Sequence, residues 1–342
     1  MYVISFSVFL QPARGLSGGL NPEEENDIIR PSQGRRAGGP PVGGTVYGID
    51  FHADDYAATP GNSERILSLL RAGRIDSVSV LINMGCCGEC MALLRENWDS
   101  LPRKPLLSAH INLIDGFRLS SPDGKTVLHN SWTRLFLQSV LPWKREKALA
   151  PLSAEIGAQL LAFRKLTADL KDDRGDPIPF RIDSHVHTHM IPLVFDALTD
   201  ALKRTGLLGE VRFIRCTAEP LSPFLFTPGV TGTVPPVNIL KNLILQLLGH
   251  SVRKKLSRLQ VDTCRVFGLA MTGNMDLKRV SLILPKMERY ARRKDVRLEV
   301  LSHPGRSAEA ELTEEYGPDD RKAFPSPKRD VEYRMLMELK RG

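Results

Sequence analysis

Residues 46–56, VYGIDFHADDY, run directly into residues 57–71, AATPGNSERILSLLR, and this stretch decides the fold. Its first part, 46–51, is rich in β-branched and aromatic residues and predicts a strand. Two adjacent carboxylates, Asp54 and Asp55, follow that strand. Thr59 and Pro60 then supply an N-cap and a proline at the first helical position, so a helix is expected over 60–71. The stretch therefore predicts a strand and a helix, with acidic side chains at the carboxyl end of the strand.

The same unit recurs along the rest of the chain. Strands are expected at 46–51, 77–82, 106–112, 180–183, 211–214, 264–269 and 297–301. Helices are expected at 60–71, 89–97, 153–171, 192–204, 237–256 and 278–293. Strands that alternate with helices at this spacing form a parallel sheet covered by helices, either open or closed into a barrel. The chain is therefore predicted to be an α/β protein.

The positions of the polar residues favour the barrel. Polar side chains end or follow six of the seven expected strands: Asp54, Asp55, Asn83, His110, Asn112, His185, His187, Arg212, Arg215 and His303. An open sheet would concentrate such residues at one switch point. A barrel gathers them on one face, at the carboxyl ends of its strands. We therefore predict a TIM-like (β/α) barrel of about seven strands, formed by residues 45–342 as a single catalytic domain.

Composition limits the class of protein. Hydrophobic residues make up 42% and charged residues 25%, which excludes a fibrous or wholly disordered protein. Residues 1–44 are rich in glycine and proline and are expected to form a flexible arm. The net charge of +8 is most concentrated at 251–258, SVRKKLSR. A solvated helix face explains that run, so no nucleic-acid partner is expected. The longest uncharged stretch, 220–240, carries five prolines and cannot form a spanning helix, so no membrane partner is expected.

The cysteines bear on the cellular compartment. There are five of them, an odd number, and their spacing does not suggest a disulfide framework. A reducing compartment fits this pattern better than secretion, so a cytoplasmic location is expected.

The densest chemical signal is Asp183-Ser-His-Val-His-Thr-His189. Three histidines at alternate positions are costly in a core unless each ring finds a partner, and a divalent cation is one such partner. Because a strand end curls, we expect only one of them to bind the cation and the others to form hydrogen bonds. Asp54 and Asp55 add a second signal. Adjacent carboxylates repel, so a metal is expected to neutralise one while the other accepts a proton.

Five ordered motifs resemble the YdjC-like carbohydrate deacetylases, which include chito-oligosaccharide deacetylases. Residues 53–56, ADDY, are similar to the family's A-D-D-F-G opening, and residues 74–83, RIDSVSVLIN, to its G-x-x-T-S-x-S-x-x-x-N strand. Residues 110–113, HINL, match H-x-N-L; residues 183–189 match D-S-H-x-H-x-H; and residues 303–305 match H-P-G. The resemblance covers the chain from about residue 46 to its end.

Two positions depart from the family pattern. Tyr56 replaces the usual Phe, and Ala57 replaces the Gly of A-D-D-F-G. Without that glycine a left-handed turn is disfavoured, so another path of the loop is the alternative.

The resemblance implies that Asp55, His110 and His185 bind one divalent metal ion. The family is described as magnesium-dependent, whereas imidazole ligands by themselves suit zinc or another transition metal. Asp54, beside the ligand Asp55, is expected to be the general base. His303 is expected to be the general acid if the sheet closes into a barrel.

Four further residues are expected to support the ligands or the substrate. His187 is predicted to orient a ligand or to substitute as the acid, and Arg212 or Arg215 to support Asp54. Asn112 shares a strand face with His110 and is assigned to the same group.

The resemblance also implies the substrate, an N-acetylated sugar or oligosaccharide, hydrolysed by a metal-activated water. Relatives tend to pair, which suggests a homodimer. One alternative is an amidohydrolase-type barrel enzyme acting on a non-sugar amide or ester, although such enzymes normally carry H-x-H on the first strand rather than the fourth. The second alternative is a non-enzymatic protein that binds acidic polymers through residues 251–258. This alternative leaves the clustered His and Asp residues unexplained.

Overall fold

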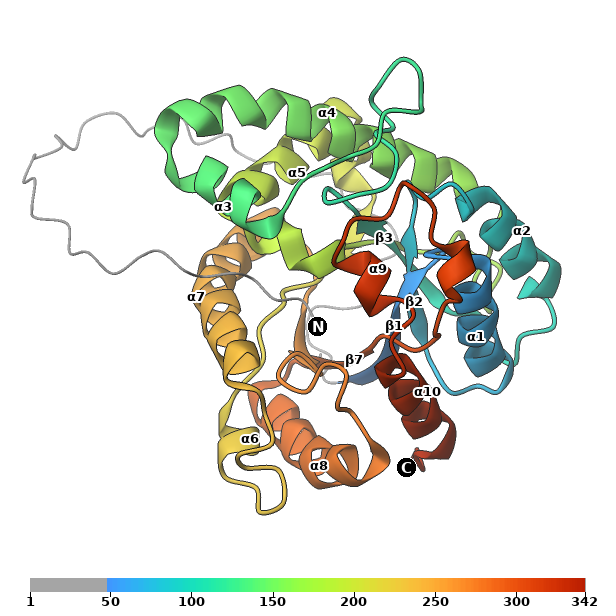
Figure 1. Cartoon of the computed structure of the whole chain (residues 1–342), viewed down its shortest axis with the longest axis vertical. Helices are drawn as coiled ribbons and strands as arrows, with labels where there is room; N and C mark the ends of the chain where they lie inside the picture. Colours follow the sequence, from blue (N-terminus) through green and yellow to red (C-terminus); the bar gives the residue numbers. More distant parts are fainter. Residues whose placement is uncertain (1–47, 342) are drawn as a thin grey trace, which may run out of the picture.

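The structure is a computed structural model that describes residues 48–341. The predicted flexible arm, residues 1–44, lies outside the described residues. Within them, one sheet curls around a central axis and helices cover its outer face (Figure 1). No helix among these residues combines the length and the apolar character needed to cross a bilayer.

All strand pairs are parallel, as the alternation of strands and helices predicts. The strands are β1 (Gly48–Tyr56), β2 (Ser77–Leu81), β3 (Leu106–Ile111), β4 (Phe180–Ser184), β5 (Val211–Ile214), β6 (Cys264–Phe267) and β7 (Arg297–Ser302). Their order in the sheet is β5-β4-β3-β2-β1-β7-β6. Phe213 of the outer strand β5 forms a parallel bridge with Asp262, just before the other outer strand β6, so the edges of the sheet meet at this point. The predicted barrel-like α/β fold with seven strands is confirmed.

Residues 48–341 also form ten α-helices and three short 3₁₀ turns, of which η3, α9 and α10 follow the last strand. The helices are α1 (Pro60–Arg71), α2 (Cys87–Trp98), α3 (Trp132–Val140), α4 (Pro142–Leu166), α5 (Pro192–Arg204), α6 (Ser222–Leu225), α7 (Pro236–Leu259), α8 (Leu277–Lys294), α9 (Asp320–Ala323) and α10 (Lys328–Glu338). The 3₁₀ turns are η1 (His185–Met190), η2 (Leu207–Gly209) and η3 (Glu309–Glu311). As predicted, Thr59 caps α1, its hydroxyl accepting a hydrogen bond from the backbone N–H of Asn62 at 3.1 Å.

Some elements differ from the sequence prediction. β1 continues to Tyr56, because the two aspartates are part of the strand rather than of a following loop. α4 begins at Pro142 and passes through Pro151, whereas the prediction began only at residue 153. The helices α3, α6, α9 and α10 were not predicted.

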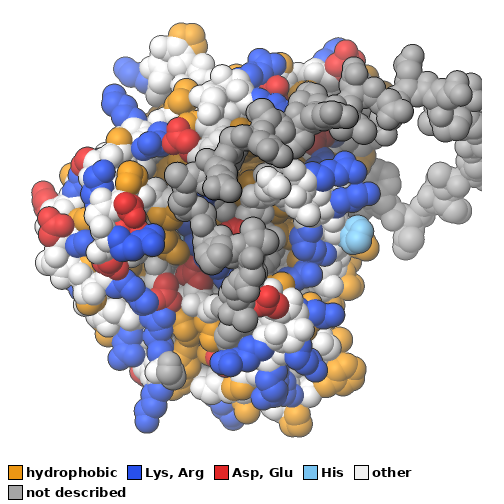
Figure 2. Space-filling model, turned by 180° about the vertical axis from the view of Figure 1, so that it is seen from behind, with side chains coloured by type: hydrophobic (Ala, Val, Ile, Leu, Met, Phe, Trp, Pro, Cys, Tyr) orange, Lys and Arg blue, Asp and Glu red, His pale blue; other side chains and the backbone are white. Residues whose placement is uncertain are grey.

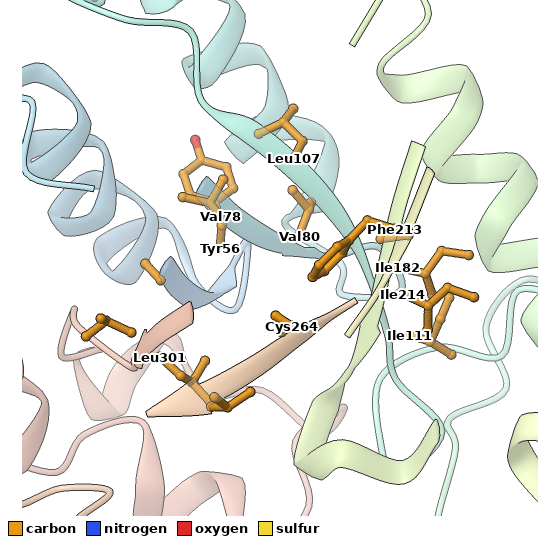
Figure 3. Close-up of a cluster of buried hydrophobic side chains, with 14 of the residues drawn as sticks. Tyr56, Val78, Val80, Leu107, Ile111, Ile182, Phe213, Ile214, Cys264 and Leu301 are labelled. Atoms are coloured by element: carbon orange, nitrogen blue, oxygen red, sulfur yellow. The ribbon is translucent and has the colours of Figure 1, made fainter. Parts of the chain in front are cut away.

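The hydrophobic core lies between the sheet and its helices. All seven strands contribute buried apolar side chains to it, among them Tyr56, Val80, Leu107, Ile182 and Leu301 (Figure 3). On the face seen from behind, Lys and Arg side chains are spread around the outline rather than gathered in one patch (Figure 2). The positive net charge is therefore not confined to residues 251–258 of α7.

The inside of the curled sheet is charged. Arg181 donates to Asp50 at 3.0 Å and lies 3.8 Å from Glu299, and Arg215 lies 2.9 Å from Asp183. All five side chains are buried. A buried charge is tolerated only when it is paired, so each guanidinium and its carboxylates depend on one another.

Removal of one member should therefore destabilise the fold. For Arg181→Met we expect a loss of about 3–5 kcal/mol in the free energy of unfolding, because Asp50 and Glu299 would stay buried without that cation. Urea unfolding followed by circular dichroism measures the loss. Arg174→Met is the matched control, since Arg174 is 81% exposed and pairs with Asp172 in solvent. The account of the interior is wrong if the two variants unfold at the same midpoint.

Candidate active site

A cavity of about 850 Å³ opens at the carboxyl end of the sheet. Its floor is formed by residues from the ends of four strands, namely Asp54, Asp55, His110, His185 and His303. Residues of α7, α9 and α10 and the segment before α3 form its walls. The sequence prediction placed the reactive residues on this face, and the structure brings these five together.

A β-bulge in β1 turns both adjacent aspartates into the cavity. The pairing of β1 with β2 slips between Ala53 and Tyr56, where three steps along β1 face two along β2. Asp55 takes a left-handed conformation with φ of 71°. In a regular strand, neighbouring side chains point to opposite faces, and an extra residue with an altered twist removes that restriction.

The turn after the bulge keeps its left-handed form. Ala57 has φ of 67° although it occupies the position of the family's glycine. Ala57 therefore adopts the left-handed conformation that its side chain disfavours, and this buried residue carries the backbone strain. Its backbone N–H donates to the Ser63 hydroxyl at 2.9 Å, which holds the turn against α1.

Asp55, His110 and His185 form a compact group of ligand type. Oδ1 of Asp55 lies 3.5 Å from Nε2 of His110 and 3.2 Å from Nδ1 of His185. The three ligand atoms are within 4.8 Å of one another, and all three side chains are buried. One carboxylate and two imidazoles suit a divalent transition metal, so the donor set fits the expected ion.

The surroundings of this group favour positive charge. Burial by itself would lower the pKa of His110, but the carboxylates of Asp54 and Asp183 raise it to about 9. Nδ1 of His110 donates to Asp183 at 2.6 Å, which turns Nε2 toward Asp55. A carboxylate behind the ring is how proteins orient a metal-binding histidine. Burial would raise the pKa of Asp55, but Arg329 and the two imidazoles hold it well below its usual range.

Side chains of the C-terminal helices α9 and α10 contact this group, and the sequence prediction missed these side chains. Asp320 of α9 lies 3.0 Å from Nε2 of His185, and Arg329 of α10 donates to Asp55 at 2.6 Å. Asp115, Asp320 and His185 form a second buried group with ligand atoms within 4.8 Å. Burial and the Asp320 carboxylate raise the pKa of Asp115 to about 7. Asp320 and Arg329 do not follow a strand, so no signal of the kind used for the other residues marked them.

Asp54, the first aspartate of the bulge, is held by different partners from Asp55. Arg215 grips both of its carboxylate oxygens, at 2.9 and 3.0 Å, and Nε2 of His52 lies 3.0 Å away. Burial would raise the pKa of Asp54, but Arg215 and His110 keep it well below the usual range. The low pKa favours the ionised carboxylate, and Arg215 contacts Asp54 directly.

His303 lies beside Asp54. Its Nε2 is 3.8 Å from Oδ2 of Asp54, and its ring is 20% exposed to the cavity. The backbone N–H of His303 donates to Glu332 of α10 at 2.6 Å, and the same oxygen lies 3.8 Å from Nδ1. Glu332 also accepts from the backbone N–H of Gly273 at 2.6 Å. This carboxylate therefore fixes the loop that carries His303.

Of the three histidines in residues 183–189, only His185 lies beside Asp55 and His110. β4 ends at Ser184, and Val186 and His187 take left-handed conformations in η1, so the side chains no longer alternate. His187 lines the cavity, and burial together with Arg215 lowers its pKa well below the usual value. His189 faces away, with Nδ1 2.6 Å from the Ser184 hydroxyl and Nε2 2.8 Å from the Arg215 carbonyl.

The predicted supporting residues Asn112 and Arg212 lie in different surroundings. Asn112 donates to Asp115 at 2.9 Å and so supports the loop after β3. Arg212 does not reach the site. It is exposed and donates to the Gly209 carbonyl, because alternate residues of β5 share a face and Arg212 lies on the face opposite to Arg215.

Comparisons with known proteins agree on a family. A family model described as YdjC-like protein matches residues 49–340. A carbohydrate deacetylase of Mus musculus is 30% identical over 176 residues, which are 49% of this chain and 49% of the relative. A carbohydrate deacetylase of Homo sapiens is 28% identical over 172 residues, 49% of this chain and 47% of the relative. The chain thus spans about half the length of the curated relatives it matches.

A solved structure supports the fold. A protein of Enterococcus faecalis V583, whose name refers to cellobiose-phosphate cleavage, superimposes with a TM-score of 0.50 at 16% identity. The match covers 86% of this chain and 92% of that chain. At this identity the likeness concerns the fold.

The ligand group can be tested by metal analysis. We expect His185→Ala to lose most of its bound metal after dialysis, because it removes one of three protein ligands. His187→Ala is the control, since His187 lines the same cavity but lies outside the group. Elemental analysis of both variants decides the matter. Full occupancy in His185→Ala together with loss in His187→Ala would show that His187 is the ligand instead.

Proposed function

This chain belongs to the YdjC-like protein family, and from that premise we propose that it is a metal-dependent hydrolase that removes acetyl groups from N-acetylated sugars or oligosaccharides. The observation that carries the proposal is the buried Asp55–His110–His185 group beside the ionised Asp54, at the floor of one cavity. The names of the mouse and human relatives support the substrate class.

Asp55, His110 and His185 would hold the ion. A divalent cation at this position supplies Lewis acidity, which polarises the amide carbonyl and makes a water molecule more acidic. Family resemblance favours magnesium, whereas the two imidazoles favour zinc or another transition metal. Asp320 contacts His185 and Arg329 contacts Asp55, so both residues fix the orientation of a ligand.

Asp54 acts as the general base. It takes a proton from the attacking water as the new C–O bond forms at the amide carbon. The two hydrogen bonds from Arg215 hold the carboxylate in one orientation, so little reorganisation is needed during the reaction. Because the pKa of Asp54 is low, the base stays ionised well into the acid range.

His303 acts as the general acid. It gives a proton to the nitrogen as the C–N bond breaks, and the products are acetate and a free amino sugar. Its ring is open to the cavity, and Glu332 holds its backbone and faces Nδ1. His187, neutral and directed to the same cavity, contributes a polar wall near Asp54.

Acetate release tests the proposal and the roles of the adjacent carboxylates. The protein, stripped of metal and then supplied with Mg²⁺, Zn²⁺, Mn²⁺ or Co²⁺ in turn, should release acetate from N-acetylated mono- or oligosaccharides. Asp54→Asn should keep its metal and lose roughly 10²–10⁴-fold in turnover, because it cannot accept a proton. Asp55→Asn should be partly rescued by a higher metal concentration, because it weakens a ligand. Absence of acetate with every sugar and metal would remove the proposal, and rescue of Asp54→Asn alone would reverse the two roles.

A further inference from the structure

The walls of the cavity differ from its floor. The floor is charged, whereas part of the wall is lined by apolar side chains from the segment between β3 and α3, from the first residue of α3 and from α7. These residues are Ile114, Leu128, Trp132, Val237, Ile244 and Leu245. The volume of about 850 Å³ is near the upper end of the roughly 300–1,000 Å³ typical of pockets for drug-sized ligands. The acetyl group occupies only a small part of this space, so the rest of the cavity surrounds the remainder of the substrate.

Helix α7 presents this wall from one face only. Val237, Lys241 and Ile244 are four and three residues apart and line the cavity, whereas Leu240 and Leu243 are 48% and 46% exposed outside it. The two faces of the helix are therefore distinct, and adjacent residues such as Leu243 and Ile244 belong to different faces.

Polar groups on the inner face of α7 are engaged within the protein. Asn238 donates to the Ala270 carbonyl at 3.1 Å, and Asn242 donates to Glu219 at 3.0 Å. Burial lowers the pKa of Lys241, and the Asp319 carboxylate opposes that shift only in part. Sugar hydroxyls therefore meet side chains that already have partners here, whereas a hydrocarbon meets Val237 and Ile244 directly.

Trp132 lines the same cavity. Its ring stacks on Phe136 with centroids 5.3 Å apart and planes inclined by 11°. The stack fixes the indole at the start of α3, so the aromatic face is held in place before a ligand arrives.

We propose that the substrate carries an apolar group of several carbon atoms, which binds between Trp132 and the inner face of α7 while its amide lies at the floor. This inference rests on the proposed function for the amide. The apolar group has two chemical sources, an N-acyl chain longer than acetyl or an apolar substituent on the sugar. Burial of each methylene against this wall adds up to about fourfold in affinity.

Binding to Asp54→Asn tests the inference without turnover. Calorimetry compares N-acetylglucosamine with N-hexanoylglucosamine, and the methyl with the hexyl glycoside of N-acetylglucosamine, in the presence of metal. We expect at least a tenfold gain in affinity for one of the two longer ligands, the N-hexanoyl sugar or the hexyl glycoside, together with a negative heat-capacity change. A gain for N-hexanoylglucosamine identifies a longer N-acyl chain as the apolar group, and a gain for the hexyl glycoside identifies a substituent on the sugar. If neither longer ligand binds more tightly, the inference is overturned, whether or not the parent enzyme releases acetate.

Paired substitutions on α7 locate the binding wall. Ile244→Gln, made in the Asp54→Asn background, should reduce the gain from the longer chain at least fivefold. Leu243→Gln in the same background is the control, because it makes the same kind of change on the outer face. Ile244→Ala and thermal unfolding of each variant show whether any loss reflects folding. Equal losses in Ile244→Gln and Leu243→Gln, or no loss in either Ile244 variant, would overturn the assignment of the wall.

Discussion

The site depends on one irregularity, the bulge that lets Asp54 and Asp55 point into the same cavity. A regular β1 would direct one of them toward the helices, where a carboxylate would face the apolar core. The bulge costs backbone strain at Asp55 and Ala57, and the surrounding hydrogen bonds hold it in place. Because the two carboxylates meet different partners, Arg215 on one and Arg329 on the other, neighbouring residues of the same type acquire different roles.

Charge compensation then extends from the site into the interior of the sheet. Arg215 contacts both Asp54 and Asp183, and Asp183 orients His110. A single guanidinium thus links Asp54, the proposed base, to His110, a proposed ligand of the metal. The charged interior is therefore a support for the site as well as a feature of the fold, since a shift of Arg215 would change the position of both.

Sequence patterns predicted the parts of the structure that follow from local order. Residues 211–214, 60–71 and 192–204 form a strand and helices with the expected bounds, because turn residues and caps mark their ends. Motifs at strand ends placed Asp55, His110 and His185 on one face, since the carboxyl ends of parallel strands meet there. Asp320, Arg329 and Glu332 could not be found this way, because they reach the site only through the path of the C-terminal helices. The bulge and the continuation of α4 through Pro151 also depend on tertiary packing that overrides local preference.

The most direct test of the account is the position of the metal in a crystal soaked with Mn²⁺, located by anomalous scattering. The account predicts one peak about 2 Å from ligand atoms of Asp55, His110 and His185, with Asp54 outside the coordination sphere and bound to Arg215. A peak on Asp54, or one held by Asp115 and Asp320 without Asp55 and His110, would contradict the assignment of the two adjacent carboxylates.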